Sequence, residues 1–557
     1  MSDRHFAFWP RSVPHSLLLP LTNLYYNVEV SATRYPNKPY LIYYDTPITF
    51  AEFRDQTERL AGFLEQECGV KPGDRVLLYT QNSPQFIVGY YAILRANAVV
   101  VPVNPMNRAT ELRHFLVDTG ATTLITTQDR FAEAVTLFAD GLKHVVVGAY
   151  SDYLRATTDL AVPDFVRALR EKISAPGVTP WAAALARNHR PGPSTVGPDD
   201  LCVMPYTSGT TGFPKGCMHT HRSAMHTIVV GESWFAYKPD DTRLAALPLF
   251  HVTGMQGSMS GPLYTGSTVV LMSRWDRDVA AQLIERYRVK AWKTISTMVV
   301  DFLANPRLGE YDLSSLRQVG GGGAAMPEAV AKQLHDEFGL GYVEGYGLSE
   351  TIAPTHTNPP DRPKRQCLGI PICDVEARVV DPNTWRELPP GESGEIVVRG
   401  PQVFRGYWNN PQATEETFVD IDGQRFFRTG DLGRVDEDGY FFMTDRLKRM
   451  INASGFKVWP AEVESMMYRH PAIQEVCVIS ANDKRRGETV KAVVVLKPVA
   501  RGNISEQDII NWTRGEMAAY KYPRIVQFVD ALPKSGSGKI MWRTLQEQEL
   551  CRGVSAA

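Results

Sequence analysis

The sequence predicts an α/β protein with a large composite N-terminal domain, residues 1–447, joined by a hinge to a small α+β C-terminal domain, residues 448–557. Three observations predict it. Short apolar runs alternate with helical stretches in the first half of the chain, closely spaced strands follow near residue 370, and a mixed pattern resumes after a charged segment. Apolar strands separated by helices are typical of a parallel sheet covered on both faces. The N-terminal domain should therefore contain two α/β units and one small β-rich unit.

The first α/β unit starts with an apolar strand at 75–79 (RVLLY). A helix is predicted at 84–97, a strand at 99–103, a helix at 109–119 and a strand at 122–127. Because each helix lies between two strands, these strands are expected to run parallel in one sheet.

The second α/β unit follows residue 200. Strands are predicted within 202–207 and at 268–272 and 290–295, with a helix at 279–288 between the last two. This repeats the alternation of the first unit and predicts a second parallel sheet.

The β-rich unit and the C-terminal domain complete the chain. Strands at 376–380 and 394–400 are separated by turn residues, and an Asp-Gly pair at 438–439 between two apolar runs predicts a hairpin. In the C-terminal domain the patterns predict helices at 461–468 and 506–518 and strands at 475–479 and 491–496. These are enough elements for a separate domain of roughly a hundred residues.

The composition excludes several classes of protein. Hydrophobic residues make up 43% and charged residues 22%, which is typical of soluble globular proteins. The net charge of -1 gives no overall attraction to nucleic acid or to an anionic membrane. The seven cysteines form no C-x-x-C pair, and no stretch approaches the roughly 18 apolar residues of a spanning helix. We therefore expect free thiols in a reducing compartment and a cytoplasmic protein, with peripheral membrane contact left open.

A loop rich in Ser, Thr and Gly, residues 207–215 (TSGTTGFPK), follows a strand-like run. Glycines let backbone N–H groups converge on a phosphate, hydroxyls add donors, and Lys215 adds a positive charge. The loop is not a Walker A motif, because Gly216 follows Lys215. A flexible surface loop is the alternative for such a composition. The preceding strand and the terminal lysine favour a phosphate-binding loop.

Four further segments carry residues suited to nucleotide chemistry: 346–351 (YGLSET), 428–432 (RTGDL), 445–457 (DRLK running into ASGFK) and 533–539 (PKSGSGK). Together with the 207–215 loop, they resemble the signature motifs of the adenylate-forming (AMP-binding) superfamily of acyl-CoA synthetases, adenylation domains and beetle luciferases. The resemblance extends from about residue 30 to 545. It implies an ATP-dependent ligase that converts a carboxylate to its acyl-AMP and then passes the acyl group to coenzyme A.

The chemistry of the motif residues agrees with this resemblance. Tyr346 offers a flat face for adenine, Glu350 is a hard oxygen ligand for Mg²⁺, and Thr351 can donate to a phosphate oxygen. Asp431 is a plausible acceptor for two ribose hydroxyls, and the glycine run at 320–323 suits a close backbone approach to a ligand, or a strand-to-helix turn.

The resemblance implies a full set of ligand contacts. The ATP/AMP site would comprise Thr207, Ser208, Gly209, Thr210, Thr211, Gly212, Lys215, Gly323, Ala324, Glu344, Gly345, Tyr346, Thr351, Asp431, Arg446 and Lys539, with Thr207 and Glu350 holding the metal. Lys539 would bridge the carboxylate and the α-phosphate, where its charge stabilises the transition state. Thr351 and His251 complete the implied catalytic set.

The same resemblance implies domain alternation. Lys448 would be the hinge about which the C-terminal domain rotates between the two steps. The rotation would withdraw the catalytic lysine and bring Ser454, Gly455 and Lys457 to coenzyme A.

The acyl pocket is expected to be lined by Trp234, His251, Met255, Met298 and Gly322. These regions are mostly small or apolar, with no obvious Arg or Lys to pair with a second carboxylate. A hydrophobic monocarboxylate follows, with a medium- or long-chain fatty acid ahead of an aryl acid of the benzoate or cinnamate type.

Other functions are open to the same motifs. A stand-alone adenylation enzyme could load a carrier protein, and a luciferase-like oxygenase uses the same first step. A non-catalytic nucleotide-binding regulator is a remote alternative, because a sensor would not need the catalytic lysine. No nucleic-acid partner is expected, and a homodimer is suggested only by similar enzymes.

Overall fold

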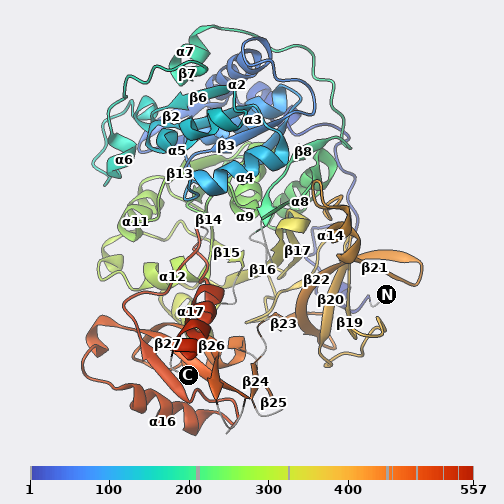
Figure 1. Cartoon of the computed structure of the whole chain (residues 1–557), viewed down its shortest axis with the longest axis vertical. Helices are drawn as coiled ribbons and strands as arrows, with labels where there is room; N and C mark the ends of the chain where they lie inside the picture. The colour runs from blue at the N-terminus through green and yellow to red at the C-terminus, as the bar shows by residue number, and fades with distance from the viewer. Residues whose placement is uncertain are drawn as a thin grey trace.

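The computed structural model describes residues 3–207, 214–323, 326–446, 449, 451–453, 456–458, 460–483, 487–518, 520–536 and 538–555. It confirms the predicted class: a large α/β N-terminal domain and a smaller domain of helices and strands at the C-terminus. Figure 1 shows the first α/β unit at the top, the second below it, the β-rich unit to one side and the C-terminal domain at the bottom.

The first α/β unit is built on a seven-stranded sheet in the order β11-β8-β4-β3-β5-β6-β7. The strands are β11 (His219–Thr220), β8 (Leu201–Val203), β4 (Val99–Pro102), β3 (Arg75–Tyr79), β5 (Thr123–Thr127), β6 (His144–Gly148) and β7 (Val178–Pro180). Every neighbouring pair is parallel except β11 with β8.

The predicted helices of this unit are present with small differences at their ends. Helix α4 spans Ala109–Thr119, as expected, whereas α3 spans Pro84–Arg95. Ser83 begins α3 by accepting a hydrogen bond from the N–H of Phe86, and Pro84 fits the first turn because it needs no donor. Asn97 has a positive φ of 59°, so the helix cannot continue to that residue.

The second α/β unit is built on a nine-stranded sheet in the order β18-β17-β16-β15-β14-β12-β13-β1-β2. The strands are β18 (Ile370–Pro371), β17 (Ala353–Thr357), β16 (Tyr342–Leu348), β15 (Gln318–Gly322), β14 (Ala291–Thr294), β12 (Thr242–Ala245), β13 (Thr268–Leu271), β1 (Pro39–Tyr43) and β2 (Thr46–Thr49). The sequence did not predict that the early β1–β2 hairpin joins this sheet, where Leu41 pairs with Val269.

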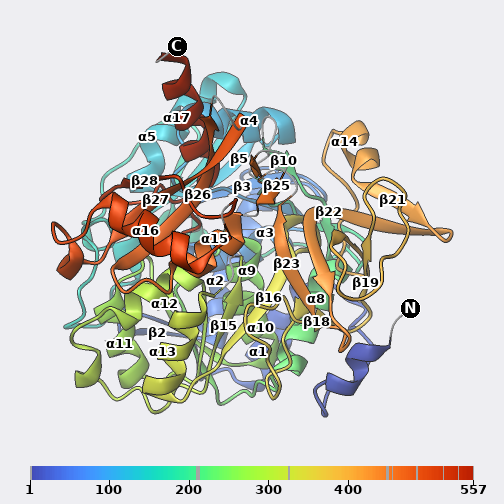
Figure 2. The same cartoon turned by 90° about the horizontal axis from the view of Figure 1, so that it is seen from below.

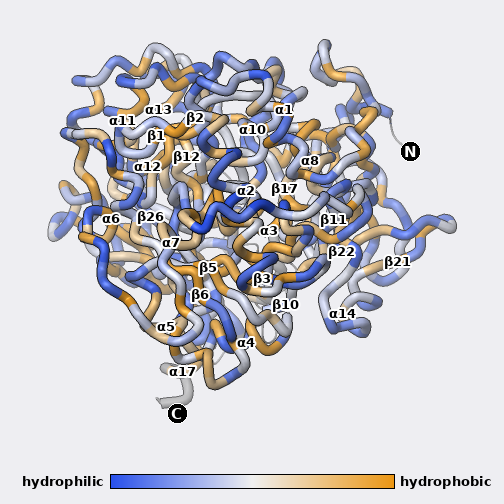
Figure 3. Tube along the Cα trace, turned by 90° about the horizontal axis from the view of Figure 1, so that it is seen from above, coloured by the Kyte–Doolittle hydropathy of each residue, from blue (hydrophilic) through white to orange (hydrophobic). Residues whose placement is uncertain are grey.

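Alternate side chains of the strands divide the core into layers. Val76 and Leu78 of β3 belong to the large core shared with the second sheet, whereas Leu77 and Tyr79 pack with α4 on the opposite face. Helices α2 (Phe50–Gln66), α3 and α8 (His221–Trp234) contribute to the shared core. Figure 3, seen from above, shows hydrophobic colour through the interior around β5 and hydrophilic segments on the periphery.

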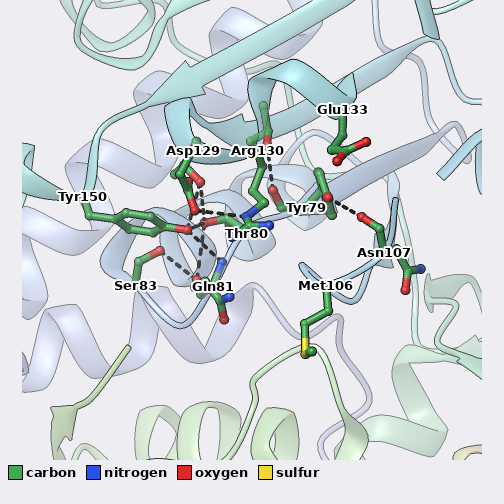
Figure 4. A network of polar contacts seen from close by, with 12 residues as sticks. Tyr79, Thr80, Gln81, Ser83, Met106, Asn107, Asp129, Arg130, Glu133 and Tyr150 are labelled. Atoms are coloured by element: carbon green, nitrogen blue, oxygen red, sulfur yellow. Dashed lines mark hydrogen bonds and ion pairs between the residues drawn. The ribbon is translucent and has the colours of Figure 1, made fainter. Parts of the chain in front are cut away.

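Polar groups close the carboxyl ends of the first sheet (Figure 4). The buried hydroxyl of Tyr150 accepts hydrogen bonds from the N–H of Gln81 at 3.0 Å, from Thr80 at 3.1 Å and from Thr127 at 2.9 Å. Tyr79 donates to the carbonyl of Asn107 at 2.6 Å. These groups satisfy one another and hold the loops after β3 and β5 together.

The β-rich unit contains β19 (Glu376–Val380), β20 (Gly394–Arg399), β21 (Phe418–Ile421), β22 (Gln424–Val435) and β23 (Phe441–Arg446). The predicted Asp-Gly hairpin joins β22 to β23. Its Gly439 has a φ of 83° and donates to the carbonyl of Asp436 at 3.0 Å.

The described residues of the C-terminal domain form a five-stranded sheet accompanied by α-helices. The strands are β24 (Ile451–Ala453), β25 (Phe456–Val458), β26 (Ile473–Asp483), β27 (Gly487–Leu496) and β28 (Ile525–Phe528), and the helices are α15 (Pro460–Met467), α16 (Glu506–Glu516) and α17 (Trp542–Ser555). Seen from below in Figure 2, β26, β27 and α16 lie in front of the N-terminal domain.

Two expectations from composition concern the whole chain. Cys68, Cys202, Cys217, Cys367, Cys373 and Cys477 are buried and form no disulfide, and Cys551 is exposed. Among the described residues, no helix has both the length and the apolar character needed to cross a membrane.

Candidate active site

The segment between β28 and α17 reaches up toward the N-terminal domain in Figure 1, and Lys539 belongs to this segment. A Cβ placed on Gly323 would lie 2.6 Å from Cε and 3.0 Å from Nζ of Lys539. Thr297 donates to the carbonyl of Gly538 at 3.3 Å, and Gly536 lies directly against the side chain of Asn104. The loop therefore docks on both α/β units, and a glycine at 323 leaves the room that the lysine occupies.

His251 faces this lysine although the two are far apart in the sequence. It begins the short helix α9 (Val252–Gly254), where its Nδ1 accepts from the N–H of Thr253 at 3.4 Å. Burial, followed by the positive charge of Lys539, lowers the pKa of His251 to about 3. The imidazole is therefore neutral near pH 7, so it adds no positive charge beside the ammonium.

A second pair joins two motifs expected to bind the nucleotide. The hydroxyl of Tyr346, on β16, donates to Oδ2 of Asp431, on β22, at 2.7 Å. Both side chains are buried, and Asp431 lies opposite Arg446 in the β22–β23 ladder. The packing of the β-rich unit on the second sheet thus brings three residues of the expected adenosine site together.

A third group surrounds Glu350. Tyr407 donates to Oε1 of Glu350 at 2.7 Å, and Nζ of Lys215 lies 4.4 Å from the centre of the Tyr407 ring. Lys215 in turn pairs with Thr207 in the β9–β10 ladder, formed by Tyr206–Thr207 and Lys215–Gly216. Sequence reasoning missed Tyr407, because a tyrosine next to a tryptophan reads as an ordinary core residue. The two ends of the phosphate loop and the expected metal ligand are thereby brought together.

Glu344 is buried on β16. Backbone N–H groups of Met326 and Gln366 bond its carboxyl group, but burial prevails and raises its pKa to about 8. Near neutral pH this carboxyl is therefore mainly protonated and can donate a hydrogen bond to an acceptor such as an adenine ring nitrogen.

Thr351 is the least accessible of the expected phosphate contacts. It is fully buried, its hydroxyl lies 3.0 Å from the carbonyl of Ala353, and it accepts from the N–H of Leu348 at 2.9 Å. A phosphate contact would require this hydroxyl to leave its backbone partner. The neighbouring Ser349, which sequence reasoning passed over, is only partly buried and is therefore the more accessible residue.

Strand packing accounts for most of the glycine run. Gly322 and the two glycines before it belong to β15, and a Cβ on Gly321 would lie 1.8 Å from the carbonyl oxygen of Thr294. A Cβ on Gly322 would lie 2.2 Å from the carbonyl of Gly345. The neighbouring strands therefore already require these glycines, and a close approach of the run to a ligand stays a prediction.

The residues expected to line the acyl pocket divide into two groups. Met255 and Met298 lie in the shared core, with Met255 in the helix that follows His251, and Gly322 ends β15. Trp234 belongs to a separate cluster with the N-terminal segment: its ring is 4.9 Å from that of Trp9, and its indole donates to the carbonyl of Asn358 at 3.0 Å. Its place in the acyl pocket stays a prediction.

Several expected residues lie outside the described part of the chain: Ser208, Gly209, Thr210, Thr211, Gly212, Ala324, Lys448, Ser454 and Gly455. For Arg446 and Lys457 only the backbone is described. Within the described residues, no three His, Cys, Asp or Glu side chains gather to form a metal cluster.

The AMP-binding enzyme family matches residues 28–408, and the AMP-binding enzyme C-terminal domain matches residues 462–539. The chain belongs to the AMP-binding enzyme family. The match confirms the resemblance drawn from the motifs, and the protein is an enzyme of the acyl-CoA synthetase type.

Individual relatives of this AMP-binding enzyme act on different acids. A long-chain-fatty-acid–CoA ligase of Bacillus subtilis (strain 168) is 33% identical over 98% of this chain and 97% of its own length. A feruloyl-CoA synthase of Amycolatopsis sp is 37% identical over 89% of this chain and 93% of its own. The crystal structure of an anthranilate CoA ligase with anthranoyl-AMP superposes with a TM-score of 0.84 at 27% identity, covering 96% of this chain and 99% of that one.

Proposed function

We propose that this protein is an ATP-dependent acid–CoA ligase that forms an acyl-AMP and pyrophosphate, and then acyl-CoA and AMP. One observation carries the proposal: Lys539, supplied by the C-terminal domain, lies against Gly323 and beside His251 in the N-terminal domain. When a carboxylate attacks a phosphate, negative charge accumulates on the phosphate oxygens. The ammonium of Lys539, at the ends of the strands, would stabilise that charge.

In the first step the protein orients two anions. Lys539 would contact the carboxylate and the α-phosphate, while Asp431 would accept from the ribose hydroxyls and Tyr346 would fix that carboxylate through its 2.7 Å hydrogen bond. The neutral His251 leaves the ammonium as the local positive charge. The protonated Glu344 would donate to the adenine.

The residues around Glu350 fit a magnesium ion bound with the triphosphate. One carboxylate oriented by Tyr407 matches the few protein ligands that Mg²⁺ takes beside phosphate oxygens, and Thr207, which pairs with Lys215 in the β9–β10 ladder, would supply a hydroxyl. When bound, the ion would neutralise charge on the phosphates. Lys215 would add a positive charge at the same edge of the site.

The second step would use a different arrangement of the domains. We place the domain boundary at Lys448, giving units 1–447 and 448–557, with rotation there withdrawing Lys539 and presenting Ser454, Gly455 and Lys457 to coenzyme A. The docked loop makes its contacts through Gly536 and Gly538, which a rotation could release without breaking either core.

For the acid we propose a medium- or long-chain fatty acid, supported by the relative from Bacillus subtilis and by the apolar Met255 and Met298. An aryl acid is the second candidate, because the feruloyl-CoA synthase shares 37% identity. A carrier protein as acyl acceptor, a cytoplasmic location and a homodimer stay predictions.

The decisive experiment measures pyrophosphate release across fatty, aryl and short-chain acids, with and without coenzyme A, for wild type and Lys539→Ala. We expect one class of acid to respond, coenzyme A to accelerate turnover, and the variant to fail. Lys534→Ala is the matched control, because Lys534 lies in the same loop but pairs with Glu475 at 2.6 Å. ATP binding without any acid-dependent release would instead favour the non-catalytic regulator.

A further inference from the structure

A lysine that sequence reasoning overlooked lies beneath the active site. Lys293 is on β14, where its Cα pairs with Ala245 of β12 and Gly320 of β15. The next residue, Thr294, pairs with Gly321 at the ends of the strands. Lys293 therefore stands one position below the glycine-lined edge that Lys539 reaches.

The side chain of Lys293 faces the helices that follow His251. The preceding Trp292 stacks on Trp275 with ring centroids 5.3 Å apart, so it occupies the opposite face of the sheet. A Cβ on Gly257 would lie 3.4 Å from Cγ and 3.8 Å from Cδ of Lys293. Gly257 belongs to the helical segment Met255–Ser260, which also carries an expected acyl-pocket methionine.

These residues border accessible space although they are deep in the fold. His251, Gly257 and Lys293 each keep part of their surface accessible, whereas the adjacent Ser258 and Trp292 are buried. Burial is nevertheless strong enough to lower the pKa of Lys293 to about 7. A group enclosed by protein and still touching accessible space is what the inner end of a substrate pocket presents.

The amino group of Lys293 lies 3.6 Å from the centre of the Phe235 ring. Within the described part of the chain it makes no hydrogen bond and no ion pair. The neighbouring carboxylate of Glu232 is occupied by Arg243, whose Nη1 donates to it at 2.8 Å, and by the hydroxyl of Thr265. Glu232 and Arg243 therefore neutralise each other. Among the described residues the ammonium of Lys293 contacts the face of the Phe235 ring, which leaves its N–H groups for an oxygen acceptor.

We propose that Lys293 recognises the far end of the acyl substrate, and that the acid carries an oxygen acceptor there: a hydroxyl, a phenol or a second carboxylate. The proposal rests on the acid–CoA ligase function and narrows its substrate class. A buried donor left without an acceptor costs free energy, so a plain alkyl end would bind less well than an oxygenated end. The hydrophobic monocarboxylate expected from the sequence is therefore revised to a fatty or aryl acid with an oxygen-containing group at the end opposite its reacting carboxylate.

Matched pairs of acids test this. Pyrophosphate release is measured for saturated fatty acids against their ω-hydroxy and α,ω-dicarboxylic counterparts, and for arylpropenoic acids with and without a ring hydroxyl. Wild type should favour the oxygenated member of at least one pair by about 10-fold or more in kcat/KM. Lys293→Met should abolish this preference mainly through KM, with the unoxygenated acid changing little.

The matched control is Lys290→Met, three residues earlier, because Lys290 pairs with Asp240 and Asp241 outside the pocket. If wild type turns over both acids of every pair equally, the proposal is overturned. It is also overturned if Lys293→Met lowers kcat/KM equally for the oxygenated and the unoxygenated acid. If that variant does not fold, the wild-type preference decides alone.

Failure of the ligase function gives a different result. If wild type releases no pyrophosphate with any acid, the function is wrong, and calorimetric affinities of the same pairs in the presence of AMP then test Lys293 directly. Tighter binding of oxygenated acids to wild type than to Lys293→Met would support its role. Equal affinities would overturn it.

Discussion

The two α/β units share an architecture but differ in the residues at the strand ends of their sheets. In the first unit the strand ends are closed by Tyr150, whose hydroxyl accepts from Thr80, Gln81 and Thr127. In the second, β15 ends in glycines, and the space beside Gly323 receives Lys539 from the C-terminal domain. In the first unit polar groups satisfy one another and close the edge, whereas in the second small residues leave room for the ammonium of Lys539. Changes at the two edges should therefore affect different properties.

The largest effect is expected from Lys539→Ala. Removing the positive charge at the developing phosphorane should lower acyl-AMP formation about 100- to 1000-fold. The unfolding midpoint in urea should stay close to that of wild type, because the side chain is only partly buried. Pyrophosphate release measures the rate of acyl-AMP formation, and urea denaturation measures the unfolding midpoint. A similar loss of rate in Lys534→Ala would show that the loop, and not this lysine, matters.

Gly321→Ala should destabilise the protein by about 3 kcal/mol, since its methyl group would overlap the carbonyl of Thr294. Urea denaturation measures this free energy of unfolding. Gly341→Ala is the control, because a Cβ there meets nothing within 4 Å. Equal midpoints for the two variants would show that the strands can move apart.

Glu344→Gln should change how stability depends on pH. The pKa of Glu344 is raised to about 8 in the folded protein, above its ordinary value, so the folded state holds a proton that the unfolded chain releases. Its contribution to stability is therefore lost as pH rises from about 4.5 to 8, by roughly 1.4 kcal/mol per pH unit. Urea denaturation at pH 5, 6, 7 and 8 should show a decline in wild type relative to the variant, and parallel profiles would contradict the assignment.

The smallest effect is expected from Tyr150→Phe at the edge of the first unit. Losing the shared acceptor leaves the N–H of Gln81 unpaired and should cost about 1–2 kcal/mol of stability. The kcat of the ligase should not change. A fall in kcat at unchanged stability would show that the first unit also contributes to the reaction.

The same contrast explains what the sequence could predict. The strand at 75–79 and the helix at 109–119 appear with the expected bounds, because their apolar patterns are local. The pairing of β1 with β13 was missed, since no local pattern encodes a partner so distant in the chain. The glycines of β15 were assigned to a turn or to ligand contact because composition cannot distinguish those roles from close strand packing.

Within the site, the sequence predicted motif residues better than their neighbours. The pairing of Tyr346 with Asp431 joins two residues chosen from separate motifs. Tyr407 and Lys293 were missed because neither belongs to a recognised motif, and only the tertiary fold reveals what each faces. Trp234 was expected to line the acyl pocket, and the structure shows it packing against Trp9.

The position of β1 also has a consequence for synthesis of the chain. Its partner Val269 is made roughly 230 residues after Leu41, which at about 5–20 residues per second is a delay of roughly 10–45 s. During that interval PYLIY is an apolar strand without the neighbour that later covers its edge. The nascent chain must therefore shield this segment, by collapse onto the early helices or by a chaperone, until the second sheet emerges from the ribosome.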